Sequence, residues 1–100
     1  MLSIKCARIV KGMTVGELAK KAGLGTSTVS QIESGAKSPS LATFMKIAEA
    51  LGYKASQLFW LEEQYRNMKK ENYTDDELRR KLLVCAVKLE EESQDSQNQN

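Results

Sequence analysis

Apolar residues recur every three or four positions along most of the chain, in short blocks that end at glycines. A glycine just past such a block is typical of a helix that ends in a left-handed residue. The glycines that follow a block are Gly12, Gly23, Gly35 and Gly52. The pattern predicts short helices joined by short turns, and no segment alternates as a strand requires.

Two helices are predicted before the second of these glycines. The first covers about residues 2–11. The second begins at Thr14, because Thr14-Val15-Gly16-Glu17 has the form of a capping box. In such a box the threonine hydroxyl accepts a hydrogen bond from the backbone N–H three residues later. The glutamate at that position accepts one from the backbone N–H of the threonine.

Three further helices are predicted within the first 59 residues. One runs from about Thr26 to Ser34 and turns Val29 and Ile32 inward, so that hydroxyls and an amide occupy its other faces. The fourth follows Ser40, a natural cap, and the fifth begins near residue 55. The apolar residues at helical spacing in the fourth helix are Leu41, Phe44, Ile47, Ala48 and Leu51.

The helical pattern continues past residue 59, which predicts a long fifth helix. Residues 72–74 interrupt it, and Thr74-Asp75-Asp76-Glu77 is a second capping box with acidic residues at a helix start. A sixth, amphipathic helix follows, with one stripe made of Leu78, Leu82, Cys85 and Leu89. Residues 93–100 contain nothing to bury, and we expect a disordered polar tail there.

Charge divides the 100-residue chain into two parts. Residues 1–59 carry eight Lys or Arg against three Glu, a net of +5, and residues 60–100 carry seven against ten, a net of −3, which together give +2. A basic region suits a polyanion, whereas an acidic one suits protein contacts. We therefore expect different partners for the two parts.

Composition argues against several classes of function. Histidine is absent, which removes the commonest general base and metal ligand, and two distant cysteines form no thiolate cluster. We expect no enzyme, no metal and no cofactor. The longest apolar run, residues 82–87, is far too short for a membrane span, and there is no apolar secretory segment. We expect a cytoplasmic protein with reduced thiols.

Residues 15–34 have the pattern of a helix-turn-helix. A small residue, Ala19, stands where two helices would cross closely, and Gly23 stands where the chain must turn. The apolar residues that would lock the second helix onto the first are Leu18, Leu24, Val29 and Ile32. Any small helical bundle contains such residues, but a match at several offsets together favours the helix-turn-helix.

Residues 4–59 resemble the Cro/C1-type (XRE family) helix-turn-helix domain of phage and bacterial repressors. The resemblance is carried by residues 14–19 (TVGELA), 29–35 (VSQIESG), 39–41 (PSL) and 47–52 (IAEALG). It implies an all-α, five-helix, lambda-repressor-like domain that binds double-stranded operator DNA as a dimer, with the third helix in the major groove. The chain then divides into a DNA-binding domain (1–59), a helical extension (60–92) and the tail (93–100).

The resemblance also implies roles for individual residues. It assigns contacts with base edges to Thr26, Ser27 and Gln31. It assigns contacts with phosphates to Thr28 and to the loop residues Lys37 and Ser38. A structural ion pair between Arg8 and Glu33 would tie the first helix to the third.

Two departures from the family pattern weaken the expected DNA contacts. The family usually has a glutamine at the first position of the second helix, where this chain has Val15, and the third helix carries no Lys or Arg. Base reading would then depend on Gln31 with adenine, on hydroxyls and on threonine methyl groups. Positive charge for sequence-independent phosphate contacts is available on Lys11, Lys20, Lys21, Lys37 and Lys46, of which we single out Lys37.

The extension has two interpretations. Its apolar residues could form a dimer or partner interface that sets two recognition helices one DNA turn, about 34 Å, apart. Alternatively, the sixth helix folds back on the fifth within one chain. The residues assigned to this interface are Trp60, Leu61, Tyr65, Leu78, Leu82, Cys85 and Leu89.

Two functions follow from these patterns. The first is a DNA-binding transcriptional regulator, a repressor that acts as a homodimer. The alternative is a protein-interaction module on a helix-turn-helix scaffold, which binds or sequesters another regulator through residues 60–89. Val15 and the uncharged third helix favour the alternative.

Overall fold

The structure is a computed structural model that describes the backbone of residues 1–98 and the side chains of residues 1–92. Over residues 1–98 the chain forms six helices and no strand, as the sequence predicts. Within that range no helix is both long enough and apolar enough to cross a lipid bilayer. The helices are α1 (Leu2–Val10), α2 (Val15–Ala22), α3 (Thr26–Ser34), α4 (Leu41–Leu51), α5 (Ala55–Lys69) and α6 (Asp75–Asn98).

Side-chain caps fix where three of the helices begin. The Thr14 hydroxyl accepts from the Glu17 backbone N–H at 3.0 Å, and the Glu17 carboxylate accepts from the Thr14 N–H at 3.1 Å, which confirms the first capping box. Ser40 accepts from the Thr43 N–H at 3.2 Å. Thr74 accepts from the Glu77 N–H at 3.2 Å. These bonds satisfy donors that the first turn of a helix leaves without partners.

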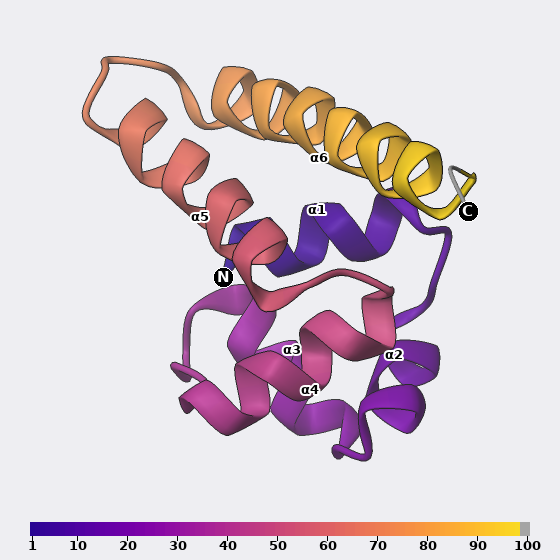
Figure 1. Cartoon of the computed structure of the whole chain (residues 1–100). Coiled ribbons are helices and arrows are strands. Elements are labelled where there is room, and N and C mark those ends of the chain that lie inside the picture. Colours follow the sequence, from indigo (N-terminus) through magenta and orange to yellow (C-terminus); the bar gives the residue numbers. More distant parts are fainter. Residues whose placement is uncertain (99–100) are drawn as a thin grey trace.

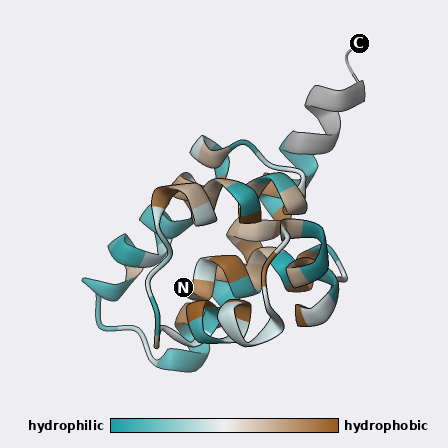
Figure 2. Cartoon of the chain, turned by 90° about the horizontal axis from the view of Figure 1, so that it is seen from below, coloured by the Kyte–Doolittle hydropathy of each residue, from teal (hydrophilic) through white to brown (hydrophobic). Residues whose placement is uncertain are grey.

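Helix α1 occupies the middle of the bundle, and its apolar residues Ile4, Cys6 and Ala7 are buried. It packs against α3, α4, α5 and α6. Figure 1 shows α6 lying across α1 at the top of the molecule, with α2, α3 and α4 gathered below. Figure 2 shows hydrophobic segments toward the middle of the bundle and a hydrophilic turn between α5 and α6. The side chains with no exposed surface are Ser3, Ile4, Ala7, Leu18, Val29, Ile32, Ile47, Leu58, Leu61, Leu82 and Ala86.

Polar contacts hold α6 onto the remainder of the chain. Lys11, at the end of α1, lies 2.8 Å from the Glu90 carboxylate and 4.7 Å from the centre of the Tyr53 ring. The Tyr53 hydroxyl donates to the same carboxylate at 2.5 Å. Burial raises the pKa of Tyr53, and its bond to Glu90 raises it further. Glu90 therefore joins α6 to the end of α1 and to the turn between α4 and α5.

Two sequence expectations differ from the structure. Leu41 falls in the apolar series of the fourth helix, yet 63% of its surface is exposed, because it lies in the first turn of α4, at the edge of the bundle. The backbone of α6 continues to Asn98, through most of the segment expected to be a disordered tail. Extending a formed helix costs far less than starting one. Residues 99 and 100 lie outside the described residues.

Candidate nucleic-acid interface

The turn between α2 and α3 is fixed by a glycine and by close helix packing. Gly23 has a φ of 69°, a left-handed conformation that costs other residues free energy. The Leu24 N–H donates to the Ala19 carbonyl at 2.9 Å, which closes the end of α2. Ala19 is 1% exposed, so its small side chain lets the two helices approach. The helix-turn-helix expected at residues 15–34 is therefore present.

The outer face of α3 carries the residues expected to read DNA. Thr26, Ser27 and Gln31 are exposed and Thr28 is half-buried, while Val29 and Ile32 have no exposed surface. Gly25 precedes the helix and supplies no side-chain cap. Because the first N–H groups of a helix have no partner inside it, this end of α3 can donate to a phosphate.

The loop after α3 is anchored to that helix by backbone and side-chain hydrogen bonds. The Lys37 backbone N–H donates to the Gln31 carbonyl at 3.1 Å, and the Ser34 hydroxyl donates to the same carbonyl at 3.1 Å. The side chains of Lys37 and Ser38 are exposed. The structure thus brings the six candidate contact residues together on α3 and the loop that folds back onto its last turn. Such an arrangement can place an amide and hydroxyls at base edges and a cation at the backbone.

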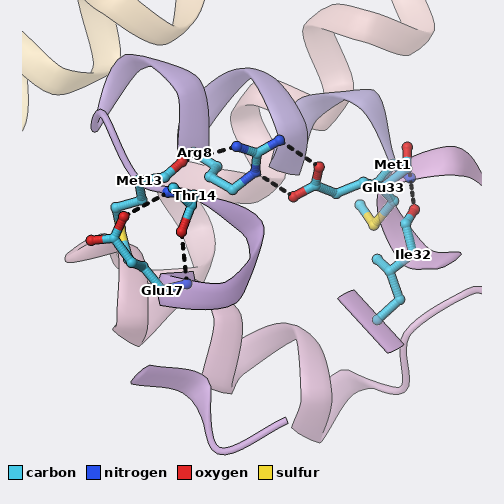
Figure 3. Close-up of polar contacts among 7 residues, drawn as sticks. All are labelled: Met1, Arg8, Met13, Thr14, Glu17, Ile32 and Glu33. Atoms are coloured by element: carbon cyan, nitrogen blue, oxygen red, sulfur yellow. Dashed lines mark hydrogen bonds and ion pairs between the residues drawn. The ribbon is translucent and has the colours of Figure 1, made fainter. Parts of the chain in front are cut away.

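Arg8 and Glu33 form the expected ion pair, and the pair is bidentate (Figure 3). Arg8 Nε donates to Glu33 Oε2 at 2.7 Å, and Arg8 Nη2 donates to Glu33 Oε1 at 2.9 Å. Arg8 Nη1 also donates to the Met13 carbonyl at 2.9 Å. The two side chains are only 12% and 6% exposed. This network joins α1, the turn before α2 and the end of α3, so it helps to set the position of α3.

Sequence reasoning missed a second contact at the end of α3. The amino group of Met1 donates to the carbonyl of Ile32 and, at 3.3 Å, to that of Glu33 (Figure 3). Partial burial lowers the pKa of this amino group, although the carboxylates of Glu62 and Glu33 oppose the shift. No local pattern in the sequence indicates a contact between positions about thirty residues apart.

The N-terminus of α2 is capped by side chains, whereas that of α3 is not. At α2 the capping box satisfies the backbone, and the hydrogen bond from the Thr14 backbone lowers the pKa of the Glu17 carboxyl. Val15, at the first position, is half-buried and contributes no polar group. This helix end therefore lacks the amide that the family usually has there.

The lysines expected to attract phosphate are not equivalent. Lys20, Lys21, Lys37 and Lys46 are exposed. Lys11 is only 23% exposed and is paired with Glu90. Lys11 therefore has less free charge to offer a phosphate than the four exposed lysines, because a carboxylate on α6 neutralises it.

The residues assigned to a dimer or partner interface are mostly internal. Leu61, Leu82 and Leu89 are at most 2% exposed and Leu78 is 7% exposed, because α6 folds back onto α1 and α5. The hairpin within one chain is the interpretation that the structure adopts, and these leucines are core residues rather than surface. Tyr65 and Cys85 are half-buried, and Trp60 is 38% exposed.

Comparison with known proteins gives one match. A family model described as helix-turn-helix matches residues 4–58, which is more than half of the chain and corresponds to the segment of the resemblance. Searches of curated proteins and of solved structures found no match. The fold, the exposed face of α3 and this match agree, and the chain belongs to the Cro/C1-type helix-turn-helix family of DNA-binding regulators.

Proposed function

We propose that the protein is a repressor that binds an inverted-repeat operator as a homodimer in the cytoplasm. The observation that carries the proposal is the single exposed surface formed by α3 and its loop, with Gln31 and Lys37 joined by a backbone hydrogen bond. In this proposal α3 enters the major groove, where the Gln31 amide pairs with an adenine. Lys37 and Ser38 contact the phosphate backbone and set the register.

The lack of basic residues in α3 supports binding as a dimer. The helix has no Lys or Arg, so it lacks the bidentate guanine contact that supplies much of the discrimination in other readers. A weak half-site gains most from a second, linked half-site, because the second binding event becomes intramolecular. Occupation of a symmetric site by two copies would exclude other proteins from the same DNA, which is repression by occlusion.

The second candidate is an interaction module that has lost DNA binding. The same uncharged α3 and Val15 at the start of α2 favour it. In that case the protein would bind another regulator. The two candidates differ in whether purified protein binds DNA at all.

Selection of bound duplexes from a random library, followed by anisotropy titrations at two salt concentrations, tests the proposal. We expect a preferred inverted repeat, and an affinity that falls steeply with salt as phosphate contacts release counterions. Gln31→Ala should relax base preference at one position per half-site, with a loss of roughly 1–3 kcal/mol in discrimination. Lys37→Ala should weaken binding to all sequences about equally, and it should make the affinity depend less steeply on salt concentration.

Lys88→Ala is the matched control for Lys37→Ala. Lys88 is an exposed lysine on α6, and its loss changes the net charge as much as the loss of Lys37 does. It should leave both affinity and salt slope close to the wild-type values. Absence of binding at low salt would reject the repressor and leave the interaction module. Equal losses in Lys37→Ala and Lys88→Ala would show that the loop has no specific role.

A further inference from the structure

Helix α6 carries a second apolar stripe on the face opposite its buried leucines. Val84 is 56% exposed and Val87 is 44% exposed, whereas Leu82, on the inner face, has no exposed surface. Arg80 and Glu91, which are exposed, continue the line of the two valines at spacings of four, three and four residues. We call Arg80, Val84, Val87 and Glu91 the outer stripe of α6.

The outer stripe has the spacing of a coiled-coil seam. Positions that alternate by three and four residues lie along one side of a helix and can pack against a second helix. The stripe begins with a cation and ends with a carboxylate, and its two central residues are apolar. It spans about 17 Å, or roughly three helical turns, at 1.5 Å per residue. A partner that fits this face is therefore another short helix with two apolar residues between opposite charges.

The charged ends of the outer stripe are available to a partner. Neither the Arg80 nor the Glu91 side chain forms a hydrogen bond or an ion pair with any of residues 1–92, the range whose side chains the structure describes. Glu90, by contrast, is bound by Lys11 and Tyr53. Adjacent carboxylates therefore have different roles, because Glu90 holds α6 onto its own chain and Glu91 faces outward.

The α6 helix of a second copy, running antiparallel, complements the outer stripe. Val84 lies four residues after Arg80, and Val87 lies four residues before Glu91. The register that places Val84 opposite the second copy's Val87 therefore also places Arg80 opposite the second copy's Glu91. Because a two-fold axis repeats each contact, the pair contains two valine contacts and two pairs of opposite charges.

Other alignments of two α6 helices bring like charges together. In a parallel pair each residue meets its own copy, so Arg80 faces Arg80 and Glu91 faces Glu91. In an antiparallel pair shifted so that Val84 faces its own copy, Arg80 faces Lys88. Like charges across an interface oppose association. Of these three alignments, only the one with Val84 opposite Val87 joins apolar contact to opposite charges.

The position of α6 separates this contact from the DNA. In Figure 1, α6 lies across α1 on the side away from α3 and α4. A copy seated on the outer stripe therefore leaves α3 and its loop uncovered, and the two α3 helices lie toward opposite ends of the pair. Such a pair does not set two α3 helices side by side on one operator, but it can join molecules that are bound at separate sites.

We propose that the outer stripe of α6 binds the outer stripe of a second copy in this antiparallel register and so joins molecules bound at separate DNA sites. The pairing itself needs no DNA, and only the joining of two sites rests on the proposed function. With two valines per chain, the contact belongs among small, transient interfaces. The free chain is then a monomer at low protein concentration and associates as the concentration rises.

Reversal of the charges at the ends of the stripe tests the register. Arg80→Glu puts two carboxylates opposite each other at both ends of the pair, and Glu91→Arg puts two cations there. Each single variant should raise the dissociation constant for self-association about tenfold, because two attractive contacts become repulsive. The double variant Arg80→Glu/Glu91→Arg restores opposite charges and should associate as the wild type does. Sedimentation equilibrium of the free protein at low salt, over a wide range of protein concentration, measures these constants.

Lys70→Glu is the matched control for Arg80→Glu. Lys70 is exposed and lies outside the outer stripe, and its reversal changes the net charge equally. It should associate as the wild type does. A loss in Lys70→Glu equal to that in Arg80→Glu would overturn the proposal, as would a double variant that stays as weak as the single variants. A wild type that remains a monomer at every concentration would also overturn it.

The joining of two sites is tested by a separate capture assay. Protein bound to an immobilised operator duplex is offered a second, labelled duplex, and we expect the wild type and the double charge reversal to capture it better than either single variant. Self-association without capture would overturn the joining of two sites and leave the α6 contact standing. Because the sedimentation assay contains no DNA, its result does not depend on whether the protein is a repressor.

Discussion

Leu82 provides the most direct test of how α6 is held. Its side chain has no exposed surface and packs where α6 meets α1 and α5. Leu82→Ala removes three carbon atoms, which corresponds to roughly 2 kcal/mol of transfer free energy at about 0.8 kcal/mol per carbon. The cavity left behind adds to this cost, and buried Leu→Ala changes generally cost about 3–5 kcal/mol. We expect a loss of about 3 kcal/mol in the free energy of unfolding.

Urea unfolding followed by circular dichroism measures this loss. Val84→Ala, two residues away on α6, is the control, because 56% of Val84 is exposed and its truncation should cost below about 0.5 kcal/mol. Equal costs for the two variants would refute the burial of Leu82. The experiment also tests the hairpin, because a helix exchanged between chains would make the urea midpoint depend on protein concentration. We expect no such dependence.

Two other predictions concern buried groups. Arg8→Ala should lower the free energy of unfolding by about 3 kcal/mol, because it leaves Glu33 buried without its partner. In a double-mutant cycle measured by urea unfolding, the double variant Arg8→Ala/Glu33→Ala should lose less than the sum of the two single changes. Arg66 is the control, because its side chain is 75% exposed and Arg66→Ala should cost below about 0.5 kcal/mol. Additive costs would mean that the Arg8–Glu33 pair contributes nothing. Burial raises the pKa of the Cys6 thiol from 9.0 to about 11. As the pH rises, the thiol therefore loses its proton in the unfolded chain before it does so in the folded protein. The stability that this thiol contributes is complete below pH 9 and is lost between pH 9 and 11. The stability difference between wild type and Cys6→Ala should therefore narrow over that range, and a constant difference would contradict the assigned pKa.

Local features of the fold were predictable from the sequence. The capping boxes at Thr14 and Thr74 depend on residues three apart, and the structure contains both. The range of α3, Thr26–Ser34, also agrees, because a threonine-rich start and a glycine at the end mark its limits. Such features involve one turn of chain, where spacing alone determines which groups can meet.

Contacts between distant segments were not predictable in the same way. The apolar stripe of α6 is equally compatible with its own chain and with a partner, because periodicity shows that a face is buried but not what covers it. The ties from Glu90 to Lys11 and Tyr53 join segments 79 and 37 residues apart. These contacts hold α6 against its own chain as a hairpin, and they neutralise the charge of Lys11.

The DNA-contacting residues were predictable from the family resemblance rather than from the pattern alone. Hydroxyls and an amide on a short helix do not themselves indicate a ligand. The exposure of Leu41 was not predictable, because Leu41 shares the spacing of the buried residues Phe44 and Ile47. Only the packing of α4 shows that its first turn lies at the edge of the bundle.

The central claim is that α3 and its loop form the surface that meets DNA. Backbone amide chemical shifts, recorded by NMR as a short duplex is added at low salt, test it directly. We expect the largest changes at Thr26, Ser27, Gln31 and Lys37, with the amides of α6 close to their free values. Changes concentrated on α6, or no changes at an excess of duplex, would contradict it.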